Sequence, residues 1–192
     1  MNRQLRVVKA DGSTEAYVHT KVLGTINNAL AAAGRPDVTM AERLAEVVTY
    51  HLYDTPDRRR IDSSEIFAMV KAVLAATDNE DAAAALTEHA LERRLQRSRT
   101  EVLAVDVQDF DDAEKLSRMA LRPRTLWDKG RIVRDLTARS GLPHQTARAI
   151  AAMAEERLFR LGLTAVPRSL VKQIVLGETA AVLHAQHQLQ TT

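Results

Sequence analysis

The sequence predicts a mainly α-helical protein in which an N-terminal β-hairpin lies on a four-helix bundle and a second, helical half follows. Hydrophobic residues make up 45% of the 192 residues, but aromatic residues only 4%. A chain rich in Ala, Leu and Val favours packed helices over a sheet-rich fold. Asp11 and Gly12 separate two short apolar runs near the N-terminus. Apolar residues with helical spacing then recur along most of the chain.

The hairpin is predicted by the apolar runs at residues 5–8 and 15–18, which lie on either side of Asp11 and Gly12. Glycine accepts the positive φ of a tight turn, and aspartate can hydrogen-bond its own backbone there. The first helix is predicted over residues 21–33, where apolar residues recur at helical spacing.

Two lysines could lie under this hairpin. Lys9 belongs to the first predicted strand, and Lys21 to the start of the first predicted helix. A hairpin that leads into a helix can cover the helices behind it, and both side chains could point into the covered space. Two ammonium groups that converge there would suit an anion such as a phosphate.

Three further helices are predicted in the first half. One spans residues 40–53 with Thr39 as its N-cap, one begins near Ser63 as its N-cap, and one spans residues 81–99. The polar, basic residues 54–60 are interpreted as a loop. The inward positions predicted for the helix over residues 81–99 are Ala83, Leu86, Ala90, Leu91 and Leu95.

The second half begins ambiguously. Residues 102–107 fit either a short strand or an extension of the preceding helix, and an acidic cluster of Asp109, Asp111 and Asp112 follows. Helices are then predicted over residues 126–140, 143–160 and 168–186. We therefore expect a first domain over residues 1–100, a linker over residues 101–125 and a helical domain over residues 126–192.

An internal repeat links the two halves. When the second half of the sequence is aligned with the first so that residue 132 matches residue 26, apolar residues coincide along two predicted helices. Further along, an alignment shifted by one residue matches Ile61 with Val166. Such a register could arise between any two pairs of amphipathic helices. It could also reflect a degenerate second copy, which would lack the hairpin because residues 109–126 contain no Lys-x-Asp-Gly turn. The pairs that coincide include Ile26 with Ile132, Leu30 with Leu136, Ala41 with Ala147, Leu44 with Ile150 and Leu52 with Leu158.

The N-terminal motif also resembles a known family. The run Val8-Lys9-x-Asp11-Gly12-x-x-Glu15, with Tyr17 and Lys21 after it, is similar to the opening of an ATP-cone domain, and further family features are present at residues 61–66 and 91–94. The resemblance covers roughly residues 3–98. It implies a hairpin on a helical bundle that binds ATP or dATP, as found in ribonucleotide reductase large subunits and in the repressor of their genes.

The resemblance implies a set of nucleotide-binding residues. Lys9 and Lys21 would contact phosphates, with Arg93 or Arg94 reaching the same pocket, although each could instead be a solvated charge. Ser63 could bind the nucleotide or only cap its helix. The full set is Val8, Lys9, Asp11, Gly12, Glu15, Tyr17, Lys21, Ile26, Ser63, Phe67, Arg93 and Arg94.

Some members of this set have a second interpretation. Val7, Val8, Tyr17 and Ile26 could form an apolar wall against adenine or belong to the core. The sequence departs from the family at Ala10, where arginine is usual, and at Phe67, where nucleotide-binding members often carry histidine. One cation is therefore missing, and the aromatic ring could stack on a base or fill the pocket.

Several function classes find no support in the sequence. The chain has no cysteine, which excludes disulfides and thiolate chemistry, and it has no Gly-x-x-x-x-Gly-Lys phosphate loop. His184 and His187 are spaced to share a helix face, but no carboxylate completes a metal site. We therefore expect no enzymatic activity. The N-terminus lacks an apolar leader and no run is long enough to span a membrane, so a cytoplasmic protein is expected.

Two functions from different classes are compatible with these observations. The first is a stand-alone module that binds ATP or dATP, with or without Mg²⁺, and modulates its own oligomerisation or a partner such as a ribonucleotide reductase subunit. The alternative is a helical interaction or transcription-associated protein with a non-binding cone. Arg58, Arg59 and Arg60, with Arg122 and Arg124, would then contact nucleic-acid phosphates. The net charge of +2 does not require such a partner, and a steep salt dependence of binding would reveal one.

Overall fold

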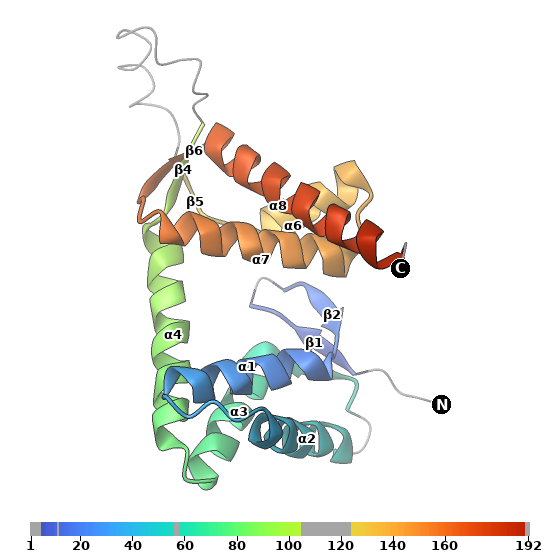
Figure 1. The fold of residues 1–192 in the computed structure, drawn as a ribbon, viewed down its shortest axis with the longest axis vertical. Coiled ribbons are helices and arrows are strands. Elements are labelled where there is room, and N and C mark those ends of the chain that lie inside the picture. Colours follow the sequence, from blue (N-terminus) through green and yellow to red (C-terminus); the bar gives the residue numbers. More distant parts are fainter. Residues whose placement is uncertain (1–4, 11, 56–57, 105–123, 191–192) are drawn as a thin grey trace, which may run out of the picture. The chain divides into compact units, whose positions relative to one another are not determined.

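The computed structural model describes residues 5–10, 12–55, 58–104 and 124–190 (Figure 1). The chain divides into two compact units, Met1–Glu92 and Arg93–Thr192. The predicted fold class is confirmed, because helices dominate and an N-terminal strand pair precedes them. None of the helices in the described ranges has an apolar stretch long enough to cross a membrane.

The first unit begins with the predicted hairpin. β1 (Arg6–Val8) pairs antiparallel with β2 (Thr14–Ala16), so that Val7 lies opposite Glu15. The turn between them is closed by a hydrogen bond from the Lys9 amide to the Ser13 carbonyl oxygen, 2.8 Å long. Gly12 has a φ of +77°, which accounts for glycine at this position.

A third strand, β3 (Arg60–Asp62), pairs parallel with β1 and gives the sheet the order β2-β1-β3. This strand was not predicted, because Arg60 was assigned to a loop. Its three residues carry little strand signal of their own. They become a strand because β1 offers a free edge and because Ile61, which lies opposite Val7, is buried.

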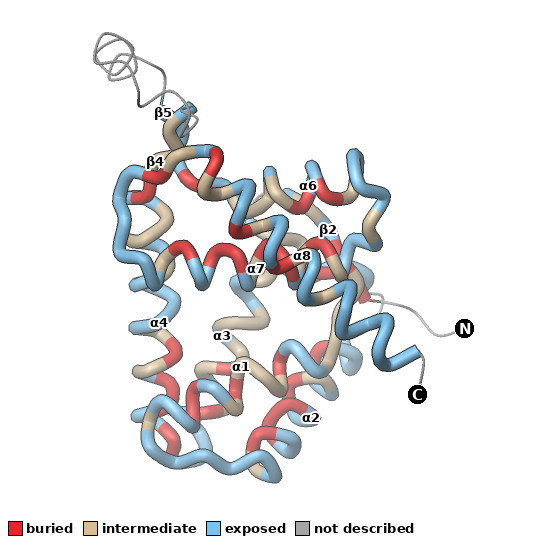
Figure 2. The backbone as a smooth tube through the Cα atoms, turned by 45° about the horizontal axis from the view of Figure 1, so that its top comes forward, coloured by how far each residue is buried: buried red, intermediate tan, exposed pale blue. Residues whose placement is uncertain are grey.

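Four helices follow or flank this sheet. They are α1 (His19–Ala32), α2 (Val38–Asp54), α3 (Ser63–Ala76) and α4 (Glu80–Arg99), of which the residues from Arg93 onward belong to the second unit. α1 packs on α2, and α2 packs on α3. The apolar faces of these helices and the inward side of the sheet form one core, in which Figure 2 shows the buried stretches of α1 and α2 in red. Its largest fully buried members include Leu5, Ile26, Leu30, Leu52, Ile61 and Leu74.

The observed helix caps differ from the predicted ones. The N-cap of α2 is Asp37, whose side chain accepts a hydrogen bond from the Met40 amide at 2.8 Å, so Thr39 lies inside the helix. The N-cap of α3 is Asp62, and Ser63 is the first helical residue. In both cases the residue with extended backbone is an aspartate one or two positions earlier, and aspartate caps at least as well as serine or threonine.

The apolar stripe predicted along α4 is only partly buried. Ala82, Ala83 and Leu86 are buried, whereas Leu91 is 56% exposed and Leu95 is also exposed. Helical periodicity identifies the face of a helix that can be buried, but it does not show how far along the helix other elements cover that face. The prediction was therefore wrong for the C-terminal part of the stripe.

The second unit contains a sheet of the same topology. β4 (Glu101–Leu103) pairs antiparallel with β5 (Arg124–Leu126) and parallel with β6 (Ala165–Pro167), in the order β5-β4-β6. Val102 lies opposite Thr125 and Val166, as Val7 lies opposite Glu15 and Ile61.

The prediction that the second copy lacks its strand pair was therefore wrong. The sequence has no tight-turn motif that would predict this pairing, because residues 104–123 separate β4 from β5. Parts of the segment assigned to a linker are strands, and the acidic cluster of Asp109, Asp111 and Asp112 lies outside the described residues.

Three helices complete the described part of the second unit, and α7 packs on both others. They are α6 (Lys129–Ser140), α7 (His144–Arg160) and α8 (Arg168–Gln190). In Figure 2, buried and exposed stretches alternate along α7, as its apolar spacing predicts. Its buried residues include Ala147, Ile150, Ala151, Ala154 and Leu158.

The predicted repeat is a repeat of structure, since both units share strand order and strand register. Ala41 and Ala147 are both fully buried at equivalent places on α2 and α7. The register of the first helix of each unit is different from the predicted one. α1 begins at His19 and α6 at Lys129, which sets Ile26 against Leu136 instead of Ile132.

Candidate functional site

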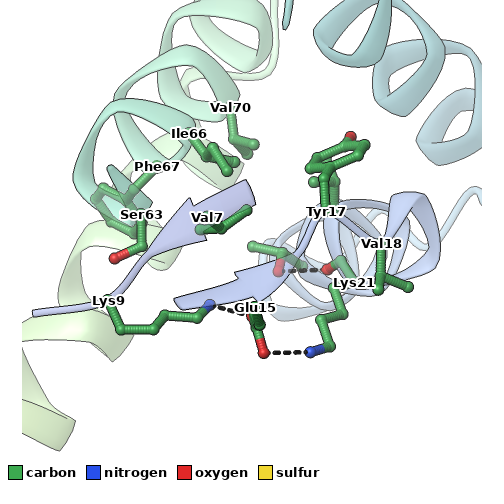
Figure 3. Close-up of a pocket in the computed structure, with 12 residues that line it drawn as sticks. Val7, Lys9, Glu15, Tyr17, Val18, Lys21, Ser63, Ile66, Phe67 and Val70 are labelled. Carbon is green, nitrogen blue, oxygen red and sulfur yellow. Dashed lines mark hydrogen bonds and ion pairs between the residues drawn. The ribbon is translucent and has the colours of Figure 1, made fainter. Parts of the chain in front are cut away.

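The first unit contains a hollow of about 160 Å³ bordered by β1, β2 and the N-terminal turns of α1 and α3 (Figure 3). Val7 belongs to β1 and Lys9 directly follows this strand, and both side chains line the hollow. Glu15 lies opposite Val7 on β2 and lines the same hollow. The sheet therefore supplies the charged groups beside an apolar surface.

The helices supply the rest of the lining. Ile66, Phe67 and Val70 project from α3 and form an apolar wall together with Val7, as Figure 3 shows. Ser63, in the first turn of α3, adds a hydroxyl group. A ligand in this hollow would thus meet charges on one side and aliphatic and aromatic groups on the other.

The charged part of the hollow is a carboxylate between two lysines. Lys9 Nζ lies 2.6 Å from Glu15 Oε1, and Lys21 Nζ lies 3.0 Å from Glu15 Oε2. The Glu15 side chain is only 8% exposed, whereas the Lys21 side chain is 48% exposed. The carboxylate holds both ammonium groups in place, and the three groups together keep one net positive charge. This arrangement can attract an anion while its own cations are already positioned.

A hydrogen-bonded cluster supports the wall at Tyr17. The Thr49 hydroxyl lies 2.7 Å from the Tyr17 hydroxyl and 2.8 Å from His19 Nδ1, and it donates to the Ala45 carbonyl oxygen. Because its single proton goes to Ala45, it accepts hydrogen bonds from both Tyr17 and His19. Burial raises the pKa of Tyr17 above its ordinary value, so the hydroxyl remains protonated at neutral pH. The Tyr17 ring also packs edge-on against Tyr53.

Six predicted site residues line this hollow, and the other described members of the set are not among its lining residues. Ile26 is fully buried and belongs to the core, which favours the second interpretation given above. Val8 lies next to Val7 along β1, so its side chain is on the opposite face of the strand. Gly12 lies in the turn. Asp11 lies outside the described residues. The residues brought together are Lys9, Glu15, Tyr17, Lys21, Ser63 and Phe67.

Arg93 and Arg94 are not among the residues that line the hollow. Both belong to the second unit, where Arg93 Nη2 lies 2.6 Å from Glu155 Oε1 and Arg94 is exposed. The sequence left open whether either arginine reaches the pocket or is a solvated charge, and the carboxylate partner of Arg93 is far away in the sequence. A contribution of either arginine to nucleotide binding stays a prediction.

Sequence reasoning missed several residues of the hollow. Ile66 and Val70 belong to the apolar face of α3 that packs in the core, and they also line the hollow. Thr25, whose hydroxyl donates to the Lys21 carbonyl oxygen, also lines it. Nothing in the local sequence distinguishes these residues from ordinary members of an amphipathic helix, and Thr49 and His19 carried no signal either.

No three histidine, aspartate or glutamate side chains of the described ranges gather as a metal site would need. His184 and His187 lie on the exposed C-terminal turns of α8. In the hollow, the one carboxylate is shared between two lysines, whereas Mg²⁺ prefers an octahedral shell of oxygens. The donor set of the hollow therefore suits an anion better than a cation.

The fold and the hollow together define a small helical domain that holds a cationic, apolar-walled ligand site against a three-stranded sheet. Residues 5–98 match the model of the ATP cone domain family, so this part of the chain is an ATP-cone domain. Such domains bind adenine nucleotides and act as nucleotide-sensing regulatory modules. No curated protein matches the chain.

Proposed function

We propose that the first unit binds ATP or dATP in this hollow and that binding changes either the self-association of the chain or its affinity for a protein partner, such as a ribonucleotide reductase subunit. The observation that carries the proposal is the triad of Lys9, Glu15 and Lys21 beside an apolar wall. The ammonium groups suit phosphates, and the wall suits a purine base.

The triad also indicates how a triphosphate would bind. Glu15 keeps the two ammonium groups in place, so little side-chain entropy remains to be lost when a phosphate arrives. The phosphate would share the hydrogens of Lys9 and Lys21 with the carboxylate. Any Mg²⁺ that accompanies the nucleotide would be held by the phosphate oxygens, because Glu15 is already occupied by both lysines.

The lysines can be tested by calorimetry with ATP, dATP, ADP and AMP. Lys9→Ala and Lys21→Ala should each weaken ATP binding by about 1.5–3 kcal/mol, the contribution of a hydrogen bond to a charged group. Affinity should fall from ATP to AMP as phosphates are removed. Lys172→Ala removes an exposed lysine of α8 in the second unit and serves as the matched control. A Lys9→Ala/Lys21→Ala chain that bound ATP as tightly as the parent would refute the assignment.

The regulatory part of the proposal predicts a change in the sheet. Strands of three residues are only marginally stable, so β1 and β2 should exchange their amide hydrogens readily without ligand. A triphosphate that joins Lys9 of the sheet to Lys21 of α1 would slow this exchange. Amide exchange with and without ATP measures the stabilisation of the sheet. Sedimentation with and without ATP measures the change in self-association.

Amides of α7 in the second unit are the internal control for this exchange experiment. Unchanged exchange in β1 and β2 at saturating ATP would contradict the proposed stabilisation of the sheet by the nucleotide. A shift in self-association that persists in the Lys9→Ala/Lys21→Ala chain would show that association is controlled elsewhere, because a ligand can shift an equilibrium only through the states it binds.

A further inference from the structure

A second charged cluster lies in the second unit, around Glu155 of α7. Its carboxylate is fully buried. Arg97 forms a two-pronged contact with it, Nε donating to Oε2 at 2.9 Å and Nη2 to Oε1 at 2.7 Å. Arg93 donates to Oε1 at 2.6 Å and Trp127 Nε1 to Oε2 at 2.8 Å, while Lys129 Nζ lies 3.3 Å from Oε1.

The cluster holds more positive charge than negative. Burial raises the pKa of Glu155, but hydrogen bonds from Arg97 and Trp127 and the charge of Lys129 together lower it to about 2, so the carboxylate is ionised at neutral pH. One carboxylate then faces two guanidinium groups and one ammonium group. Burial lowers the pKa of Lys129 and the charges of Arg97 and Arg93 also lower it, although the charge of Glu155 and its hydrogen bond act in the opposite direction. Clustered, partly buried cations of this kind are unfavourable without further compensation.

The fold does not require a carboxylate at this place, because the first unit has a threonine at the position equivalent to Glu155. Tyr17 and Trp127 donate equivalent backbone hydrogen bonds to the carbonyl oxygens of Leu5 and Thr100, and α1 and α6 each begin two residues later. Thr49 lies on α2 where Glu155 lies on α7, since the two helices have equal length and equivalent buried alanines. Trp127, Lys129 and Glu155 thus stand where the first unit has Tyr17, His19 and Thr49.

The aromatic neighbours of the two clusters also correspond. Tyr17 packs edge-on against Tyr53, with 6.1 Å between the ring centres. Trp127 packs edge-on against Phe159, with 6.3 Å between the ring centres. The guanidinium of Arg93 lies 5.8 Å from the centre of the Phe159 ring. The second unit has therefore kept the packing of this region and added three cations to it.

We infer that Arg93, Arg97 and Lys129 form a binding site for a phosphate dianion, either free phosphate or the phosphate group of a small phosphorylated ligand. An arginine has five N–H donors and a lysine three, and only one from Arg93, two from Arg97 and one from Lys129 are directed at Glu155. The remaining donors are accessible, since the Arg97 side chain is 42% exposed and the other two are partly exposed. Glu155 acts as the positioning residue that holds the cations together.

The charge of the cluster fits this ligand. Two uncompensated positive charges match the two negative charges of a phosphate dianion, and guanidinium groups offer the paired donors that phosphate oxygens accept. The inference concerns the second unit only and does not depend on nucleotide binding by the first.

Trp127 provides the measurement, because it is the only tryptophan of the chain and donates a hydrogen bond to Glu155. The full chain is titrated with sodium phosphate and, at matched ionic strength, with sodium chloride. A saturable change in tryptophan fluorescence is expected with phosphate alone. Arg93→Gln and Lys129→Gln should each weaken the affinity for phosphate about tenfold or more. Arg139→Gln, which removes an exposed arginine of α6, should behave as the parent.

Two further variants make the outcome decisive. Arg93→Lys keeps the charge, so it should retain binding within a few-fold of the parent even if Arg93→Gln proves unstable. The Lys9→Ala/Lys21→Ala chain should retain the full response. An ATP titration shows whether the phosphate is accepted free or within a nucleotide. The inference is overturned if neither ligand changes the fluorescence, or if the response disappears with the first unit's lysines.

Discussion

Glu155→Gln should destabilise the second unit by about 3–5 kcal/mol, the range found when one partner of a buried ion pair is removed. The substitution preserves the shape of the side chain but leaves Arg93, Arg97 and Lys129 without their common counter-charge. Urea denaturation followed by Trp127 fluorescence measures the loss, because this tryptophan lies in the second unit.

The neighbouring residue provides a matched control for this experiment. Glu156 is 53% exposed and pairs with Arg160 on the surface of α7, so Glu156→Gln should cost no more than about 1 kcal/mol. Equal effects of the two substitutions would show that the cluster around Glu155 does not stabilise the unit.

The pH dependence gives a second check on Glu155. Its pKa is lowered from 4.5 to about 2 in the folded chain, so its contribution to stability is complete above pH 4.5 and is lost as the pH falls towards 2. The difference in unfolding free energy between parent and Glu155→Gln should therefore shrink across this range. A difference that stays constant would contradict the lowered pKa.

Ile26→Ala should destabilise the first unit by about 2–5 kcal/mol, the usual cost of truncating a buried isoleucine. Ile26 is 0% exposed and lies in the core between α1 and its neighbours. Amide exchange in α1 and α2 under native conditions measures the loss for this unit alone. Leu91→Ala truncates an exposed leucine and should change stability by no more than about 0.5 kcal/mol.

The same variant separates a role in packing from a role in binding. If Ile26 belongs only to the core, the ATP affinity of the Ile26→Ala chain should equal that of the parent at temperatures where the first unit remains folded. A weaker affinity in a fully folded variant would return Ile26 to the set of nucleotide-binding residues.

Much of the first unit could be predicted because its signals are local. The turn at Gly12, the helical spacing of apolar residues and the position of Lys21 at the start of a helix all depend on neighbours within a few residues. Val7 belongs to β1 and Lys9 directly follows this strand, and pairing across the hairpin places Glu15 opposite Val7. Lys9, Glu15 and Lys21 line the hollow for this reason, whereas Ser63 and Phe67 reach it from α3, which is distant in the sequence.

The errors arose where partners are distant in the sequence. β3 and the pairing of β4 with β5 depend on strand edges contributed by other segments, and a strand of three residues has too few residues to show a pattern of its own. The exposed end of α4 has the same apolar spacing as its buried start, because spacing records the face of a helix and not its neighbours.

The sequence by itself determined the helical fold class, the N-terminal hairpin and the two lysines expected beneath it, because propensity, turn chemistry and periodicity act over short distances. Only the tertiary structure decided which charges meet. It joined Lys9 and Lys21 through Glu15, and it assigned Arg93 to Glu155, a residue that looks like an ordinary acid on an amphipathic helix. Ion pairs depend on the distance between charged groups in space, and for residues far apart in the sequence this distance is set by tertiary packing.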